Sequence, residues 1–388
     1  MYQMLSAARR NMARVFTSLL VAACLLPALT ERAYAIVTLS DNSELFVTGT
    51  ASVAANDNIF LSNNNEKSAL IFDLIPGLSY QSGNDTSIEQ TKVSVSEDFQ
   101  EYADGVSLSK QLTNADLSSR YDDDKMKLNF IASFNQYDQP EVGLQNLDFL
   151  VERDVTNLEG TGEVQFSDKS SGGVGVNYND TDYQKSGFTN WSYVEVPVDY
   201  YWKVEPKLDL SAGFRYRDNT VGTGGIDSQN YYYNVGARGE FTPDLTGEFD
   251  VGYNELSPSH GGTQSSLGAD SKFIYAYSPK TSVTVSLNED YGYSATGGEG
   301  YRQPNASIGV TSALTEQWSA DAQVSYAEYE YISTPQRDDF YAAQVGLSYV
   351  FDKNISVHGT YSYGKDNSNI AADSFTSNIF TLSASFRY

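Results

Sequence analysis

Cysteine, histidine, proline and long apolar runs are all scarce in this chain of 388 residues. Its one cysteine is Cys24 and its two histidines are His260 and His358, which excludes a cysteine–histidine metal cluster, so we expect neither a metal nor a cofactor. Beyond residue 35 there is no run of 18 apolar residues, which excludes transmembrane helices. The 29 tyrosines and 19 phenylalanines instead favour many β-strands.

Positive charge is also scarce. The chain has 25 Lys and Arg against 50 Asp and Glu, a formal net charge of −25. A chain this acidic offers no basic patch that would hold phosphates, so we expect no nucleic-acid partner. The acidity suits a polar lumen and polar external loops. The low mean hydropathy of −0.40 is compatible with a membrane barrel, because alternating strands dilute the apolar signal in any window.

The first 35 residues have the layout of a secretory signal peptide. Three arginines precede an apolar run over 15–29, and Ala33-Tyr34-Ala35 is a small-x-small cleavage pattern. We therefore predict two parts, a signal peptide over 1–35 and a mature chain over 36–388 that forms one domain. Cleavage would remove Cys24 and change the net charge from −25 to −28, because four arginines and one glutamate leave with the peptide.

A lipoprotein signal is the alternative at this end of the chain. Val21-Ala22-Ala23-Cys24 resembles the lipobox of a bacterial lipoprotein, in which Cys24 would be lipidated and kept. Apolar residues continue past Cys24 to a better cleavage site, which favours the signal peptide.

The last eleven residues alternate between two faces. A period of two predicts a strand, and the soluble alternative is the last strand of a sandwich. An apolar strand at a chain end promotes edge-to-edge aggregation unless it closes a barrel that faces lipid. A strand ending in an aromatic residue resembles the closing strand and assembly signal of bacterial outer-membrane barrels. This implies that outer-membrane lipid and the barrel-assembly machinery are partners. The residues of this signal are Phe380, Leu382, Ala384, Phe386 and Tyr388.

The same alternation recurs along the mature chain and predicts an all-β fold, a single transmembrane antiparallel up-and-down β-barrel of 18 strands, with 16 as the alternative. Short connections such as 205–207 alternate with longer ones rich in Gly, Asn and Ser such as 219–228. Short turns are periplasmic and long loops are external in such barrels. The predicted strands are 45–55, 68–81, 87–99, 106–120, 126–137, 150–167, 171–181, 193–204, 207–217, 229–241, 244–255, 264–277, 281–293, 301–314, 317–330, 340–351, 354–364 and 375–388.

Three glutamates break the alternation. Glu289, Glu328 and Glu330 fall on the outward faces of their strands. Either a β-bulge near the rim or a strand end beyond the membrane would explain them.

Two elements early in the mature chain are specific. Asp57-Asn58-Ile59-Phe60 follows an alternating strand, and Pro76-Gly77-Leu78-Ser79-Tyr80 ends the next strand. The segment from Val47 to Tyr80 resembles the start of a family of outer-membrane barrels called beta-barrel porin 2. Members of that family tend to occur with exopolysaccharide synthesis and export systems. The resemblance therefore implies a pore for polysaccharide, with a periplasmic export protein as a partner.

The faces opposite the apolar ones carry charges and aromatic rings that would line the lumen. Acidic and basic groups on neighbouring strands form either a charged constriction that selects permeants or ion pairs that stabilise the wall. Two inward tyrosines, Tyr193 and Tyr201, could stack on sugars. The predicted pore-lining residues are Tyr193, Glu195, Asp199, Tyr201, Asp209, Arg215, Arg217, Arg238, Glu240, Glu248, Asp250 and His358.

Three functions follow from these patterns. The first is a porin-like, water-filled pore, because barrels of 16–18 strands generally leave an aqueous channel. An inward-folded segment from Tyr137 to Arg153 would narrow it. The second is a structural or adhesive surface protein without a transport role. The third is a hydrolase that uses His358 with a serine on the same strand face. Nothing in the sequence supplies an orienting group or an oxyanion hole, so we do not expect an enzyme.

Overall fold

The structure is a computed structural model, and it describes residues 37–40, 42–84, 86–103, 108–140, 143–144, 147, 149–293, 295–296 and 300–388. The predicted signal peptide over 1–35, including Cys24, lies outside these residues. Within them, no helix is long and apolar enough to cross a membrane. The strands are β1 (Val37–Ser40), β2 (Ser43–Asn56), β3 (Ala69–Ser82), β4 (Glu89–Ala103), β5 (Lys110–Asp122), β6 (Met126–Gln139), β7 (Val151–Ser167), β8 (Ser170–Tyr183), β9 (Trp191–Glu205), β10 (Leu208–Val221), β11 (Ser228–Thr242), β12 (Leu245–Pro258), β13 (Gln264–Ser278), β14 (Thr281–Gly292), β15 (Tyr301–Ala313), β16 (Trp318–Tyr331), β17 (Arg337–Val350), β18 (Ile355–Ser368) and β19 (Phe375–Arg387).

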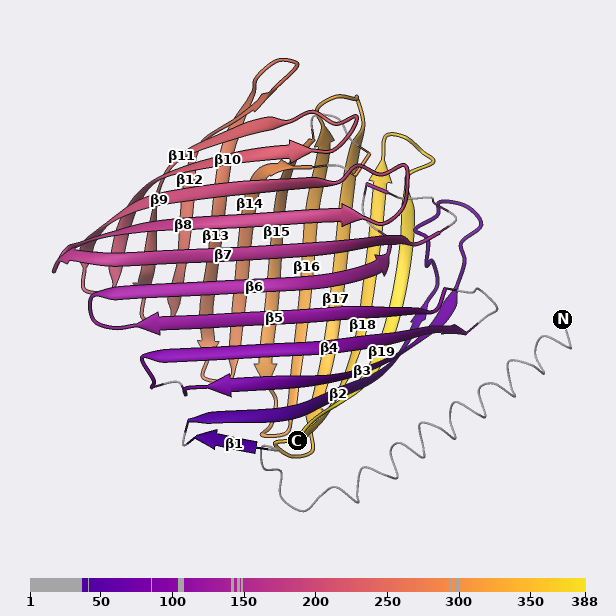
Figure 1. The fold of residues 1–388 in the computed structure, drawn as a ribbon, viewed down its shortest axis with the longest axis horizontal. Helices are drawn as coiled ribbons and strands as arrows, with labels where there is room; N and C mark the ends of the chain where they lie inside the picture. Colours follow the sequence, from indigo (N-terminus) through magenta and orange to yellow (C-terminus); the bar gives the residue numbers. More distant parts are fainter. Residues whose placement is uncertain are drawn as a thin grey trace, which may run out of the picture.

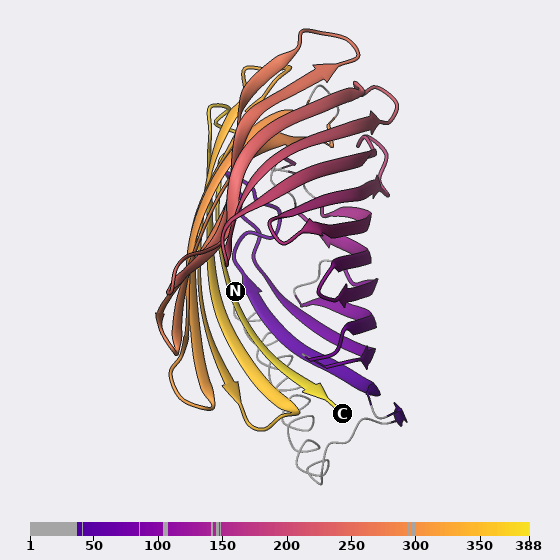
Figure 2. The same ribbon diagram turned by 90° about the vertical axis from the view of Figure 1, so that its left-hand side faces the viewer.

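Strands β2 to β19 close into one antiparallel barrel. Each pairs with its neighbours in the sequence, and β19 pairs with β2, from Ile379↔Asn56 to Arg387↔Thr48. Tyr388 completes the seam, because it and Val47 exchange both backbone hydrogen bonds at 2.8 Å. Figure 1 shows β3–β9 crossing in front of β13–β19, and Figure 2 shows the same two walls from the side. The predicted barrel of 18 strands is confirmed.

The sequence did not predict the short strand β1. It pairs with the start of β2, where Val37 lies opposite Leu45. This position is just beyond the Tyr388–Val47 pair, so β1 occupies the edge of β2 that β19 leaves open where the chain ends. An unpaired strand edge is a template for association with other chains. β1 therefore covers the part of the β2 edge that β19 leaves unpaired at the periplasmic rim.

The outward face of the barrel has an apolar band between two aromatic rows. Within the closing strand, Phe380 is 56% and Leu382 46% exposed, as lipid-facing side chains would be in an isolated barrel. Trp318 and Tyr326 of β16 mark the two edges of the band. They are about 20 Å apart along the membrane normal once strand rise and tilt are allowed for. At the outer edge, three tyrosines donate hydroxyl hydrogen bonds to acids on their own strand: Tyr216 to Asp218, Tyr253 to Glu255 and Tyr326 to Glu328.

The three outward glutamates lie beyond this tyrosine row and are ion-paired. Arg302 contacts Glu289 at 2.8 Å and Glu330 at 3.0 Å, and Arg337 contacts Glu328 at 2.6 Å. The ladders that join β14 to β17 have no register shift. The β-bulge explanation is therefore wrong, and these charges belong to strand ends outside the apolar band.

Candidate functional site: the lumen of the barrel

All twelve predicted lumen residues occupy the inward-facing positions of their strands. These positions alternate with exposed apolar residues such as Val198, Leu210 and Val235, which face outward. The residues are Tyr193, Glu195, Asp199 and Tyr201 on β9, Asp209, Arg215 and Arg217 on β10, Arg238 and Glu240 on β11, Glu248 and Asp250 on β12, and His358 on β18.

Four of the inward charges form a buried group that we call the outer ion cluster: Glu195, Arg215, Arg217 and Asp290. Arg217 is 8% exposed and lies 2.6 Å from Glu195 and 2.7 Å from Asp290. Arg215 contacts the same two carboxylates, at 3.4 Å from Glu195 and 2.8 Å from Asp290. Asp290 is on β14, four strands away from the arginines on β10. The cluster therefore bridges two parts of the wall and closes off the corner formed by β11–β13.

The sequence analysis missed Asp290, although the alternation points to it. Val285 and Leu287 of β14 face outward, so Asp290 falls on the inward face. The sequence did not show that Asp290 lies close to the arginines of β10, because β10 and β14 are not neighbouring strands of the sheet. They come close together only because the sheet bends at the β11–β13 corner.

A second group, the inner ion cluster, lies nearer the periplasmic turns and consists of Glu163, Asp209 and Arg238. Arg238 contacts Glu163 of β7 at 2.7 Å and Asp209 of β10 at 3.3 Å. Glu163 also accepts a hydrogen bond from Ser171 at 2.6 Å. Both clusters pair every arginine with acids, which corresponds to the wall-stabilising alternative of the sequence analysis.

The two inward tyrosines are covered by these arginines. The guanidinium of Arg217 lies 5.0 Å from the ring centre of Tyr193, and that of Arg238 lies 3.3 Å from the ring centre of Tyr201. Tyr193 also stacks on Trp191, with ring centres 6.2 Å apart. Each ring therefore has a cation–π partner on one face, which removes that face from contact with a sugar.

An acidic cavity of about 620 Å³ adjoins the outer ion cluster, whose Glu195, Arg215 and Asp290 line part of it. Asp199, Asp250 and Asp270 line it, and Asp250 and Asp270 are paired directly across β12 and β13. Ser211 donates a hydrogen bond to Asp250 at 2.9 Å. Among the described residues, none of these three aspartates has an ion-pair partner within 4.0 Å, so this part of the wall carries uncompensated negative charge.

The remaining predicted residues lie outside the clusters. Glu240 pairs with Lys207 at 2.6 Å beside a periplasmic turn, and Glu248 lies opposite Lys272 in the ladder. His358 on the far wall shares a 2.6 Å hydrogen bond with Ser348 of β17. The backbone amides around this pair are used in the sheet ladder. In the described part of the chain, no three Asp, Glu, His or Cys side chains are grouped to hold a metal ion.

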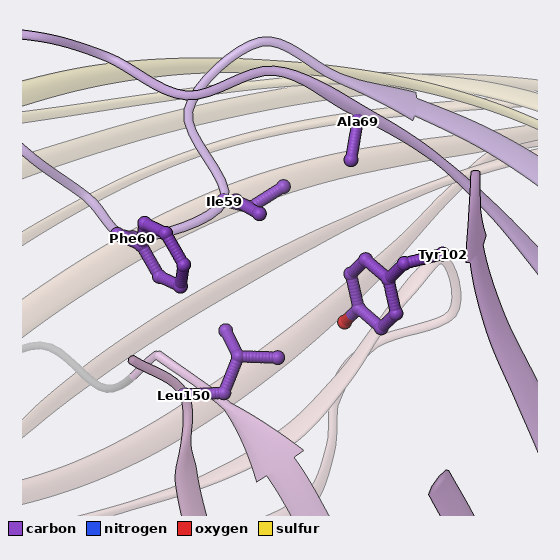
Figure 3. Close-up of a cluster of buried hydrophobic side chains, with 5 residues drawn as sticks. All are labelled: Ile59, Phe60, Ala69, Tyr102 and Leu150. Carbon is purple, nitrogen blue, oxygen red and sulfur yellow. The ribbon is translucent and has the colours of Figure 1, made fainter. Parts of the chain in front are cut away.

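Buried apolar side chains gather at the outer mouth of the lumen. Ile59 and Phe60, from the β2–β3 connection, pack with Ala69, Tyr102 and Leu150, and Figure 3 shows the five side chains converging. Ile59 is 1% exposed, which is unusual for a residue in a loop. The β2–β3 connection therefore folds over the mouth.

A second contact crosses the mouth from the β6–β7 connection, within the segment that the sequence analysis singled out as inward-folded. Leu144 packs against Val151, Tyr183 and Ala295, and Ala295 lies between β14 and β15. The carbonyl of Ala295 also accepts a 2.7 Å hydrogen bond from the backbone of Thr189, between β8 and β9. Connections from distant parts of the barrel therefore meet over the lumen and narrow it.

Replacing Leu144 by serine should loosen this contact and raise single-channel conductance. Removing a buried leucine costs about 2–5 kcal/mol, which is comparable to the packing energy of a small loop cluster. Planar-bilayer recording measures the effect, and Leu144→Met, which keeps the volume, is the control. Equal conductance of the serine variant and the control would show that this contact does not limit the pore.

A closed barrel with an apolar outer band, aromatic edges and a polar interior defines a transmembrane β-barrel of the outer-membrane type. The model of the family described as "Putative beta-barrel porin 2" matches residues 47–388. The chain belongs to this family and is a porin-like barrel of the bacterial outer membrane.

Solved structures with a similar fold are also outer-membrane proteins. A BenF-like porin from Pseudomonas fluorescens Pf-5 is 9% identical, with a TM-score of 0.50, and the match covers 90% of this chain and 100% of that chain. OpdQ from Pseudomonas aeruginosa is 11% identical, with a TM-score of 0.49 and coverages of 90% and 99%. At these identities the likeness concerns the fold alone. No curated protein matches the sequence of the chain.

Proposed function

We propose that this barrel is a passive, water-filled pore and that it is the exit channel for a secreted polysaccharide. The observation that carries the proposal is the composition of the wall opposite the charged strands. Along the middle of β16–β19 and β2, the described inward positions are hydroxyls, amides, small residues, one histidine and one acid, Asp321, so this wall is nearly neutral. They include Gln323, Ser325, Gln344, Ser348, His358, Thr360, Ser362, Thr381, Ser383, Thr50 and Ser52.

A nearly neutral wall of this kind suits a polyhydroxylated solute. Hydroxyl and amide groups donate and accept hydrogen bonds, as sugar hydroxyls do, so a saccharide can exchange its water for wall contacts without a change of charge. Some wall groups already bond to one another, as Thr50 does with Ser385 at 2.9 Å. Contacts of this strength are weak enough for a permeant to replace, which a conduit requires.

Strands β7–β9 lie on the other side of the lumen (Figure 2), and the charged strands β10–β13 continue from them around the barrel. Three arginines of these strands, Arg215, Arg217 and Arg238, are held in the two ion clusters, so their charge is fixed. The narrowed outer mouth is consistent with a conduit for one extended chain and less so with a wide general porin. A periplasmic export protein would supply the polymer, and assembly into the membrane would use the barrel-assembly machinery.

Two measurements test the proposal. Purified protein in planar bilayers should form stable channels, and absence of conductance would contradict the pore. Cells that lack the gene should lose surface polysaccharide and regain it when the gene is returned. If such cells kept their polysaccharide but lost attachment or envelope integrity, the structural alternative would replace the export role.

A further inference from the structure

Three lysines in the lumen differ from the arginines in forming no ion pair, although each lies opposite an acid in the ladder: Lys127 opposite Glu163, Lys203 opposite Asp209 and Lys272 opposite Glu248. Lys127 of β6, Lys203 of β9 and Lys272 of β13 occupy inward positions near the periplasmic ends of their strands. In the described part of the chain, none of them forms an ion pair within 4.0 Å, whereas the lumen arginines of both clusters do. In a chain with twice as many acids as bases, unpaired inward lysines are unexpected.

The three lysines share one cavity at the periplasmic end of the lumen, which we call the basic vestibule. Its volume is about 1050 Å³, and Lys207 and Arg238 also line it. Two acids, Asp209 and Glu248, line the same cavity. Five positive side chains therefore face two negative ones, and Asp209 is already engaged by Arg238 at 3.3 Å.

Two further acids are paired with bases that line the vestibule itself. Glu163 is held by Arg238, and Glu240 is held by Lys207. In the β5–β6 turn, hydrogen bonds from the backbone N–H of Lys125, the hydroxyl of Tyr121 and the backbone N–H of Met126 lower the pKa of Asp123. The carboxylate of Asp123 thus interacts with its own turn. Arg238 and Lys207 are therefore offset by their acid partners, and the remaining excess of positive charge in the vestibule comes from Lys127, Lys203 and Lys272 against Glu248. A low-dielectric wall focuses the field of such an excess toward the lumen.

We propose that the basic vestibule is a binding site for carboxylate or phosphate groups on a sugar chain that enters the barrel from the periplasm. The polymeric nature of this ligand rests on the proposed export function, whereas the anion site itself does not. The three lysines occupy inward positions, where an extended chain or a small anion inside the lumen would reach them. Because lysine is a flexible point charge, the site would hold successive groups of a polymer without fixing one geometry.

The charges further along the wall determine from which side of the membrane an anion would reach the site. Beyond the vestibule, Asp199, Asp250 and Asp270 present negative charge on the same strands. An anionic chain would be attracted at the periplasmic mouth and repelled by this patch toward the nearly neutral wall opposite. The vestibule therefore acts on one side of the membrane only.

Direct binding to the detergent-solubilised barrel tests the site. The probe is fluorescently labelled oligogalacturonate, followed by anisotropy, with neutral maltodextrin of similar length and inorganic phosphate as competitors. The variant Lys127→Gln/Lys203→Gln/Lys272→Gln should bind on the order of tenfold more weakly, because three charge contacts are lost. The control Lys280→Gln/Lys353→Gln/Lys365→Gln removes the same charge from two periplasmic turns and the outer face, and should stay within about twofold of wild type.

The outcomes separate the anion site from the pore. Competition by phosphate but not by maltodextrin, with weakening at high salt, supports an anion site. Equal losses in the two triple variants, or equal competition by maltodextrin, would overturn it. In planar bilayers, oligogalacturonate should block current only from the periplasmic side, and block from both sides alike would also overturn the proposal. If the protein forms no channel, the pore fails while the binding measurement still decides the site.

Discussion

Replacing Arg217 by methionine is expected to lower the free energy of unfolding by about 3–5 kcal/mol, the cost of removing one partner from a buried ion pair. Arg217 contacts Glu195 and Asp290 and donates a 3.3 Å hydrogen bond to the carbonyl of Tyr291. Methionine would fill a similar volume but would leave two buried carboxylates that share only Arg215. The loss in free energy of unfolding therefore reports mainly the missing positive charge between the two carboxylates, and much less the change in packing.

Urea unfolding of the barrel in lipid vesicles, followed by tryptophan fluorescence, gives this free energy. Arg120→Met is the matched control, because Arg120 pairs with Asp122 at a site where the arginine side chain is 56% exposed. That variant should change stability by no more than about 0.5 kcal/mol. Adding Asp290→Asn to Arg217→Met should recover part of the loss, since one buried charge disappears. Similar stability of the Arg217 and Arg120 variants would show that the outer ion cluster is solvated and does not hold the walls together.

Strand periodicity was sufficient to predict the barrel. Each of the 18 predicted segments overlaps one of the strands β2–β19, because lipid on one side and water on the other impose a period of two wherever the chain crosses the membrane. The same parity assigned Arg215 and Arg217 to the lumen. This parity depends only on the face of the strand to which a residue points. The neighbouring residues of the same strand are enough to determine that face.

Contacts across the lumen could not be predicted in the same way. The distance between Arg217 and Asp290 depends on how sharply the sheet bends between β10 and β14, and no single strand encodes that curvature. β1 was missed for a related reason. Four residues give too short a pattern, and the strand pairs with the first residues of β2, which β19 does not reach. Both features are consequences of closure and not of local propensity.

The sharp bend at the β11–β13 corner has a visible cause in the sequence. Gly252 of β12 and Gly268 of β13 lie directly opposite one another on the inward face. A Cβ at Gly252 would overlap the carbonyl oxygen of Tyr233 and lie 2.7 Å from the Cα of Asn234. Inward glycines let neighbouring backbones approach closely on the concave side, which is how sheets are curved on purpose. The corner in turn brings Asp290 within reach of the two arginines on β10.

Replacing Gly252 by alanine should therefore open the corner and separate the outer ion cluster. The clash is with backbone atoms, which cannot rotate away as a side chain can, so the free energy of unfolding should fall by about 3 kcal/mol or more. Gly160→Ala is the control, because the nearest atom to a Cβ there is Cδ2 of Phe130 at 4.0 Å, an ordinary contact. The same urea titration of the double variant Gly252→Ala/Arg217→Met tests whether Gly252 stabilises the barrel by holding the outer ion cluster together. If it does, the double variant should lose clearly less than the sum of the single losses, whereas additive losses would mean that the glycine and the ion cluster stabilise the barrel independently.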